Sequence, residues 1–239
     1  MKHLDEKMFA AMRTTQTEGA AAEEAELVKG AAVGTAAGAT ANDAPEGPNA
    51  LGPVDVERAF LRIGDEIVPF QTVHVLDGKL SLRLPKTFRI MPEELARLKY
   101  PSEHRPGLIY TDETHTVNLA FNLTSTPLNQ EELEDFQEAL TRMLRSTQPI
   151  ERWMGEGMET VDGRKAGTCA FVIPTLTSSV FNLMFYSDLE DKALLCTFNC
   201  LESDMNDWKP VAEAMLRSMK WEHENDSQLP TSNQGGVRV

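Results

Sequence analysis

Residues 156–219 read EGMETVDGRKAGTCAFVIPTLTSSVFNLMFYSDLEDKALLCTFNCLESDMNDWKPVAEAMLRSM. Within this stretch, the turn Asp162-Gly163-Arg164 lies between two segments of strand-like composition, 157–160 and 166–173. Asp-Gly tolerates the positive φ angles of a tight hairpin. Residues 180–186 and 193–200 form a second pair, joined by a polar link too short for anything but an antiparallel return. The stretch therefore predicts an antiparallel meander.

After Ser203-Asp204 the apolar spacing changes from the period of a strand to that of a helix. The apolar residues then follow one helical stripe, which consists of Trp208, Val211, Ala212, Met215, Leu216 and Met219. An apolar stripe of this width needs a sheet beneath it. The meander is therefore predicted to end in a helix that packs on it.

A second helix is predicted upstream, over Asn129–Ser146. Asn129 and Glu132 have the spacing of a capping box, and apolar residues then recur every three or four positions. Acidic residues occupy the outer side: Glu131, Glu134, Asp135 and Glu138. They form either a patch for a basic partner or an ordinary solvated helix face, and the second interpretation is favoured.

Residues 54–124 have a strand-rich pattern. Residues 60–63 and 67–70 flank a Gly64-Asp65 turn, and residues 79–85 alternate so that leucines face a core and polar residues face out. A short helix is predicted from Pro92 to Tyr100, followed by strands at 107–111 and 114–124. This order of elements predicts an α+β fold in which helices cover an antiparallel sheet.

The ends of the chain differ from this middle part. Residues 1–53 lack sustained periodicity and end in a stretch rich in Ala, Gly and Pro, which indicates a disordered tail and linker. In the alternative, Leu4, Met8, Phe9 and Met12 line a short docking helix. We expect one domain over residues 54–221 and a disordered C-terminal tail over residues 222–239.

Composition limits the classes of function. The formal net charge is -14 at pH 7 with a pI of about 4.8, which argues against a nucleic-acid partner. No apolar run reaches the length of a membrane span, and Asp5 and Glu6 interrupt any signal-peptide core. Cys169, Cys196 and Cys200 lie inside predicted strands, the usual setting of reduced core thiols. These features predict a cytoplasmic protein that does not insert into a membrane.

Several motifs give the chain a resemblance to the PsbP/DcrB superfamily. They are GKLSLRLP at 78–85, VDGRKAG at 161–167, and KALLCTF at 192–198 followed by Trp208 and RSMK at 217–220. The resemblance covers about residues 77–221. It implies an α/β/α sandwich on an antiparallel sheet, with members that mostly bind proteins. They include a Ran-binding nuclear import factor of yeast, bacterial lipoproteins, and chaperones that hold transmembrane segments of type VI secretion effectors.

Neither the family pattern nor the residues supply an assembled catalytic site. The five histidines are scattered, and no phosphate-binding glycine loop, nucleophile elbow or zinc spacing is present. We therefore predict no catalytic residue, no metal and no cofactor. A semi-rigid loop that carries Tyr100, Glu103, His104 and Arg105 is the predicted binding site of a protein-binding adaptor or chaperone.

An enzymatic alternative has a site built from residues that are distant in the sequence. Its candidate side chains are His104, Arg105, Glu113 and His115. The two hypotheses differ in whether these side chains converge in one cleft.

Overall fold

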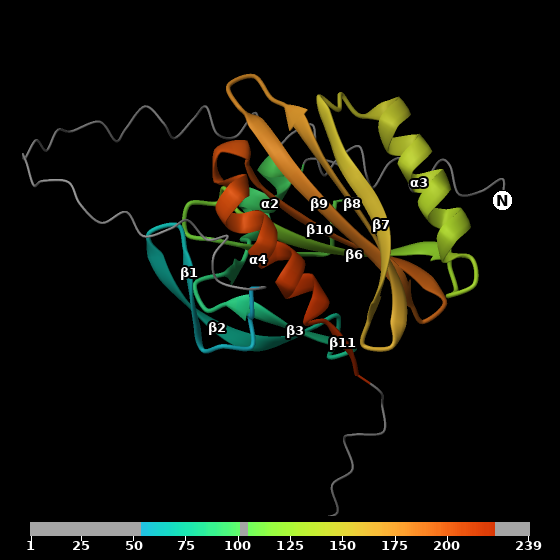
Figure 1. Cartoon of the computed structure of the whole chain (residues 1–239), viewed down its shortest axis with the longest axis horizontal. Helices are drawn as coiled ribbons and strands as arrows, with labels where there is room; N and C mark the ends of the chain where they lie inside the picture. Colours follow the sequence, from blue (N-terminus) through green and yellow to red (C-terminus); the bar gives the residue numbers. More distant parts are fainter. Residues whose placement is uncertain (1–53, 101–104, 223–239) are drawn as a thin grey trace, which may run out of the picture.

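A computed structural model of the chain describes residues 54–100 and 105–222. The predicted tails lie outside these ranges, except for Glu222, whose backbone N–H donates to the carbonyl of Lys79. The described strands form two antiparallel sheets, whereas the sequence pattern predicted one. The predicted α+β class is confirmed (Figure 1).

The large sheet has seven strands in the order β4-β5-β6-β10-β9-β8-β7. Their bounds are β4 Arg89–Ile90, β5 Leu108–Thr111, β6 Asn118–Pro127, β7 Arg152–Val161, β8 Arg164–Pro174, β9 Ser179–Leu189 and β10 Lys192–Leu201. The predicted meander is confirmed as β7 to β10. It joins the earlier strands through β10 and β6, where Phe198 pairs with Leu119. This long-range pairing makes β7 an edge strand.

The small sheet has the order β1-β2-β3-β11. Its strands are β1 Phe60–Ile63, β2 Glu66–Val75, β3 Leu80–Pro85 and β11 Lys220–Trp221. The three leucines of β3 are at most 1% exposed, as their alternation predicts. The intervening polar residues do not all face solvent, however. Ser81 is only 4% exposed because β11 pairs beside it and the Glu222 carboxylate accepts its hydroxyl.

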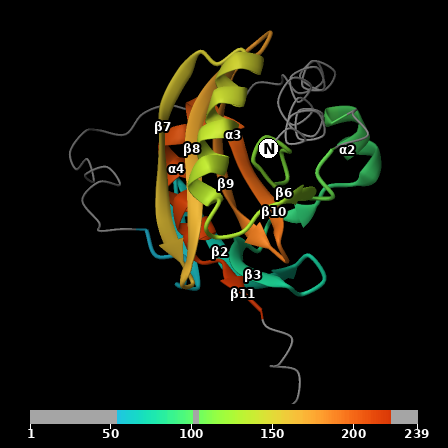
Figure 2. The ribbon, with the colours of Figure 1, turned by 90° about the vertical axis from the view of Figure 1, so that its right-hand side faces the viewer.

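Helices cover both faces of the large sheet. The helices α2 Glu93–Lys99 and α3 Leu133–Thr147 pack on one face. On the other face, α4 Met205–Arg217 follows the short helix η3 Glu202–Asp204 and shares a core with the small sheet. Figure 2 shows α3 crossing β8 and β9, with β7 beyond it on the side opposite α2. The predicted sandwich is therefore present, with the small sheet added to one of its outer layers.

Two elements begin later than the sequence pattern predicts. The helix predicted from Asn129 begins at Leu133, because the Asn129 side chain accepts the N–H groups of Glu131 and Glu132 and holds residues 129–132 in a separate turn. The strand predicted from Thr114 begins at Asn118. There the Asp112 carboxylate accepts the N–H of Val117 and extends the loop after β5.

Tight turns fix the register of the meander. Asp162 and Gly163 have φ of 50° and 75°, and Val161 pairs with Arg164, as expected for a two-residue hairpin. Glu190 and Asp191 have φ of 51° and 57°, so the link predicted to span five residues is a two-residue turn as well. Strands β9 and β10 are consequently longer than predicted.

Most of the apolar stripes predicted for the two long helices are buried: Leu133, Phe136, Leu140 and Leu144 in α3, and Val211, Ala212, Met215 and Leu216 in α4. Of the other predicted residues, Trp208 is half-buried, and Met219 is buried but lies beyond the end of α4. The three cysteines are free and buried in the strands, which confirms their prediction as reduced core thiols. None of the described helices has the length and hydropathy needed to span a membrane.

Candidate functional site

The predicted recognition loop contains one residue whose position differs from the prediction. Tyr100 is 2% exposed and packs with Met91, Ala96, Ile109 and Ala120 beneath α2. The α2 helix lays this side chain onto the face of β5 and β6, so Tyr100 is a core residue and does not lie at a contact rim. The local pattern of aromatic, proline and charge could not show this, because burial depends on where α2 docks.

Tyr100 also belongs to a buried polar network. Burial raises the pKa of the Tyr100 phenol, and a hydrogen bond with the Asn199 side chain partly opposes this effect. The amide of Asn118 donates to the Asn199 carbonyl oxygen at 2.9 Å, and the Thr111 hydroxyl donates to Asn118 at 2.8 Å. The network joins α2, β5, β6 and β10, and its role is to hold these elements together.

The remaining residues of the predicted sites are placed only in part. Glu103 and His104 lie outside the described residues, so their roles stay predictions. Arg105 lies 4.0 Å from the Glu93 carboxylate at the start of α2, with 29% of its side chain exposed. It stays a candidate contact residue.

The described residues show no contact that would support the enzymatic alternative. Glu113 is exposed on the loop after β5, and His115 adopts a φ of 63° on the same loop. The Lys99 ammonium donates to the backbone carbonyl of His115, which ties the end of α2 to this loop. No ion pair or hydrogen bond joins Arg105 to Glu113 or His115 in the described ranges.

The described residues also give little support to a cysteine nucleophile or to a metal site. Burial raises the pKa of the Cys169 and Cys200 thiols to about 12 and raises that of Cys196 as well. A thiol that keeps its proton at neutral pH is a poor nucleophile. No group of three or more His, Cys, Asp or Glu side chains within residues 54–100 and 105–222 is placed to hold a metal ion.

The described surface offers a different candidate, the outer edge of β7. This strand has ten residues, and among the described strands it pairs with β8 alone. The opposite edge of the sheet, β4, has two residues. A long edge strand displays a row of backbone donors and acceptors on which another chain can pair. β7 is therefore a candidate surface for binding another protein.

The register shows which β7 backbone groups point outward. The pair Val161–Arg164 flanks a two-residue turn and is therefore hydrogen-bonded. Hydrogen-bonded pairs alternate along an antiparallel ladder, so Glu159 and Gly157 also direct their N–H and C=O groups toward β8. Glu156, Met158 and Thr160 direct theirs away from the sheet. These three residues define the segment that we call the β7 edge.

Side chains of the β7 edge are accessible on the face that carries α3. Glu156, Met158 and Thr160 are all exposed, and Met158 is 37% exposed. Its cross-strand neighbour on β8 is Gly167. Because α3 lies over β8 and β9, it leaves this part of β7 uncovered (Figure 2).

The other end of β7 is closed by packing and by a bulge. The Trp153 ring stacks on Phe171 with the centroids 5.7 Å apart, and the Arg145 guanidinium lies 4.3 Å above the Trp153 ring. The register shifts between Trp153 and Gly155, whose φ is 137°. A bulge bends an edge strand and interrupts its regular pairing pattern. The usable edge therefore runs from Glu156 to Thr160.

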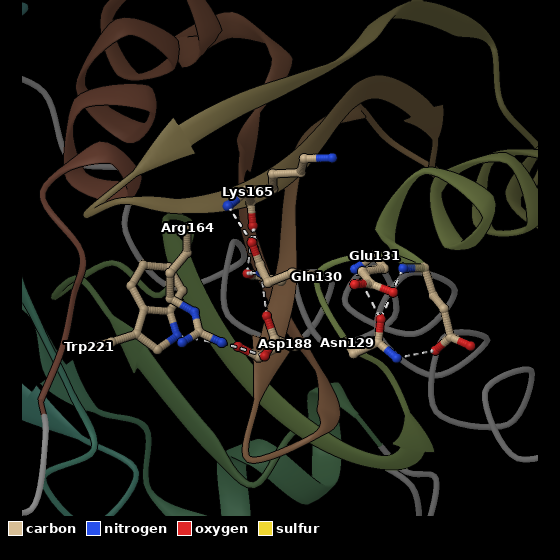
Figure 3. A network of polar contacts seen from close by, with 9 residues as sticks. Asn129, Gln130, Glu131, Arg164, Lys165, Asp188 and Trp221 are labelled. Carbon is tan, nitrogen blue, oxygen red and sulfur yellow. Dashed lines mark hydrogen bonds and ion pairs between the residues drawn. The ribbon is translucent and has the colours of Figure 1, made fainter.

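A polar network holds the hairpin that carries β7. Figure 3 shows the Gln130 side chain between β8 and β9, where it accepts the Lys165 N–H at 2.6 Å and donates to the Asp188 carboxylate. Arg164 forms an ion pair with Asp188, and the Trp221 indole N–H donates to the Asp188 carbonyl at 3.2 Å. The hairpin of β7 and β8 is thereby tied to the turn before α3, to β9 and to β11.

Comparisons with known proteins concern the fold. No protein-family model and no curated protein matches the chain. The chain is similar to the solution structure of cyanobacterial PsbP (CyanoP) from Synechocystis sp. PCC 6803, with 13% identity, a TM-score of 0.45, and coverage of 66% of this chain and 96% of that chain. The Ran-binding protein Mog1p of Saccharomyces cerevisiae matches with 12% identity and a TM-score of 0.43, covering 64% of this chain and 96% of its own.

A third solved structure is that of LpqN, which is involved in cell envelope biogenesis of Mycobacterium tuberculosis. It matches with 14% identity, a TM-score of 0.36, and coverage of 66% of this chain and 93% of its own. The resemblance predicted from the sequence was to the PsbP/DcrB superfamily, and PsbP and the Ran-binding protein Mog1p are among the solved structures to which the chain is similar.

Proposed function

We propose that the chain is a protein-binding module, an adaptor or chaperone, that takes an extended segment of a protein partner as an added strand along the β7 edge. The observation that carries the proposal is that Glu156, Met158 and Thr160 point their backbone groups out of the sheet while their side chains stay exposed. Strand addition of this kind supplies affinity through main-chain hydrogen bonds and specificity through alternate side chains.

The β7 edge offers backbone hydrogen bonds to a partner strand. Three outward residues offer three donors and three acceptors, and each hydrogen bond contributes on the order of 0.5–1.5 kcal/mol net. The edge is also held in place before binding, because the network around Gln130 and Asp188 fixes the hairpin. A preformed edge loses little conformational entropy when a partner strand docks.

The proposed location is the cytoplasm. Three free, buried thiols support it, since reduced cysteines are the usual state in that compartment. The acidic balance of the chain supports a protein partner over a nucleic acid.

A proline at Met158 tests the proposal. Met158→Pro removes an outward N–H but no hydrogen bond to β8, and proline is tolerated on the free side of an edge strand. Met158→Val removes the same thioether and keeps the N–H, so it is the matched control. Thermal unfolding of both variants shows whether the fold is intact.

The readout is photo-crosslinking in cells with a crosslinking amino acid placed at Thr160 of the full chain. We expect a specific protein adduct that is lost in Met158→Pro and kept in Met158→Val. A crosslinker at Thr72, exposed on the small sheet, reports nonspecific contact. An adduct that survives Met158→Pro, or that forms equally from Thr72, would mean that the β7 edge is not the binding surface.

A further inference from the structure

The chemistry around the β7 edge indicates which strand it accepts. The segment 129–161, which holds α3 and β7, contains eight acidic and three basic side chains. Two of the three bases already have carboxylate partners, since Arg142 pairs with Glu138 and Arg152 with Glu202. The third, Arg145, lies over the Trp153 ring. Lys165 of β8 pairs with Glu134, and Arg217 of α4 pairs with Glu159. Within the described ranges the segment therefore keeps more carboxylates without an ion pair than cations, and its remaining charge is negative.

Glu156 is the acidic residue of the β7 edge itself. No ion pair joins it to another side chain in residues 54–100 and 105–222, whereas Glu159, on the opposite face of the strand, pairs with Arg217 at 2.8 Å. Its negative charge acts inward as well, since it contributes to the raised pKa of the Cys169 thiol, second to burial. A cation from a partner would meet this carboxylate without displacing an existing partner.

The two faces of the β7 edge also differ in the size of the side chains that they carry. On the α3 face the exposed side chains are those of Glu156, Met158 and Thr160, whereas the opposite face carries Gly157 between them. A Cβ built on Gly157 would have one neighbour within 4 Å, the Thr168 hydroxyl at 3.7 Å. The face of Gly157, which also carries the Glu159–Arg217 ion pair, therefore has room for branched side chains of an added strand, and the face of Glu156 favours long cations.

Resting on the proposed function, we propose that the partner segment is an extended basic strand of about five residues, in which lysine or arginine alternates with β-branched residues and a cation pairs with Glu156. Residues 156–160 are the five positions of β7 that stay regular between the bulge at Gly155 and Val161, which closes the hairpin. The length of the partner segment follows from these five positions. Opposite charges directly across two strands attract, and like charges repel.

The probe is a capped peptide of seven residues that alternates lysine and valine, and its counterpart has glutamate in place of lysine. Each is titrated into the isotope-labelled full chain, and the backbone amide signals are followed by NMR. We expect the lysine peptide to shift the signals of Glu156, Met158 and Thr160. The glutamate peptide should bind about fivefold more weakly, as expected for exchanging an attractive cross-strand pair for a repulsive one.

Glu156→Gln should reduce this preference to within about twofold, because it removes the charge and keeps the shape. Glu113→Gln, the same change on an exposed loop after β5, should leave the preference intact. Equal binding of both peptides, blocked in each case by Met158→Pro, would overturn the basic partner while the proposed function stands. Lysine-peptide binding that survives Met158→Pro would overturn both.

The sequence itself ends in an arginine between two valines, Val237-Arg238-Val239, which has the alternation of the proposed segment. If the lysine peptide binds only after residues 223–239 are deleted, this segment of the chain itself occupies the β7 edge. That result would overturn the proposal that the basic strand comes from a partner protein. Equal binding with and without the deletion supports the partner.

Discussion

The contact between Gly167 and Tyr186 gives the sharpest test of how the large sheet is packed. A Cβ added at Gly167 would lie 2.0 Å from Cε2, 2.5 Å from Cζ and 2.8 Å from Cδ2 of the Tyr186 ring. All three distances are below any real van der Waals contact, so either the ring or the strand must move in Gly167→Ala.

The ring has little room to move. Tyr186 is fully buried, and the Phe136 ring of α3 lies 5.7 Å from it between centroids. Overpacking a well-packed core typically costs about 1–3 kcal/mol. Alanine would otherwise be favoured over glycine in a strand by roughly 0.5–1 kcal/mol. Because the contact is with a rigid ring, we expect a net loss of about 2 kcal/mol, or roughly 4–8 °C in Tm for a domain of this size.

Urea unfolding followed by circular dichroism measures this loss. Gly107→Ala is the matched control, since its Cβ would meet nothing within 4 Å. In a Tyr186→Ala background the cost of Gly167→Ala should nearly vanish, because the ring that it strikes is gone. A loss below about 0.5 kcal/mol in the single variant, or an unchanged loss in the Tyr186→Ala background, would refute this account of the packing.

Three further predictions concern the core. Leu140→Ala should lower the free energy of unfolding by about 2–5 kcal/mol in urea titrations, because Leu140 is fully buried; a loss typical of exposed sites would show that α3 is not packed as described. Tyr100→Ala should lower the free energy of unfolding by about 3–5 kcal/mol, whereas Arg105→Ala should leave Tm nearly unchanged; equally small effects of the two changes would show that Tyr100 is not a core residue. The raised pKa of Cys169, from 9.0 to about 12, means that the folded thiol holds its proton more tightly than the unfolded one. Its contribution to stability is present below pH 9 and should be lost as pH rises toward 12, which a Cys169→Ala comparison of unfolding against pH would detect.

The sequence by itself determined the local elements of this protein. Asp162-Gly163 defined a hairpin because those residues tolerate positive φ, and the stripe of Leu133, Phe136 and Leu140 defined a helix with one buried face. The buried, reduced state of the cysteines also followed from their positions inside strands. All of these features depend on neighbours a few residues away, and the structure reproduces each one.

Only the tertiary structure decided which strands lie in the middle of a sheet and which lie at its edge. The pairing of β6 with β10 joins residues 65 to 81 positions apart in the chain, and it places β7 outermost. The docking of α2 likewise buried Tyr100, which a local pattern of proline and charge had placed at the surface. Strand order and helix docking follow from the total apolar area that distant segments bury together, and no local period of a sequence encodes that sum.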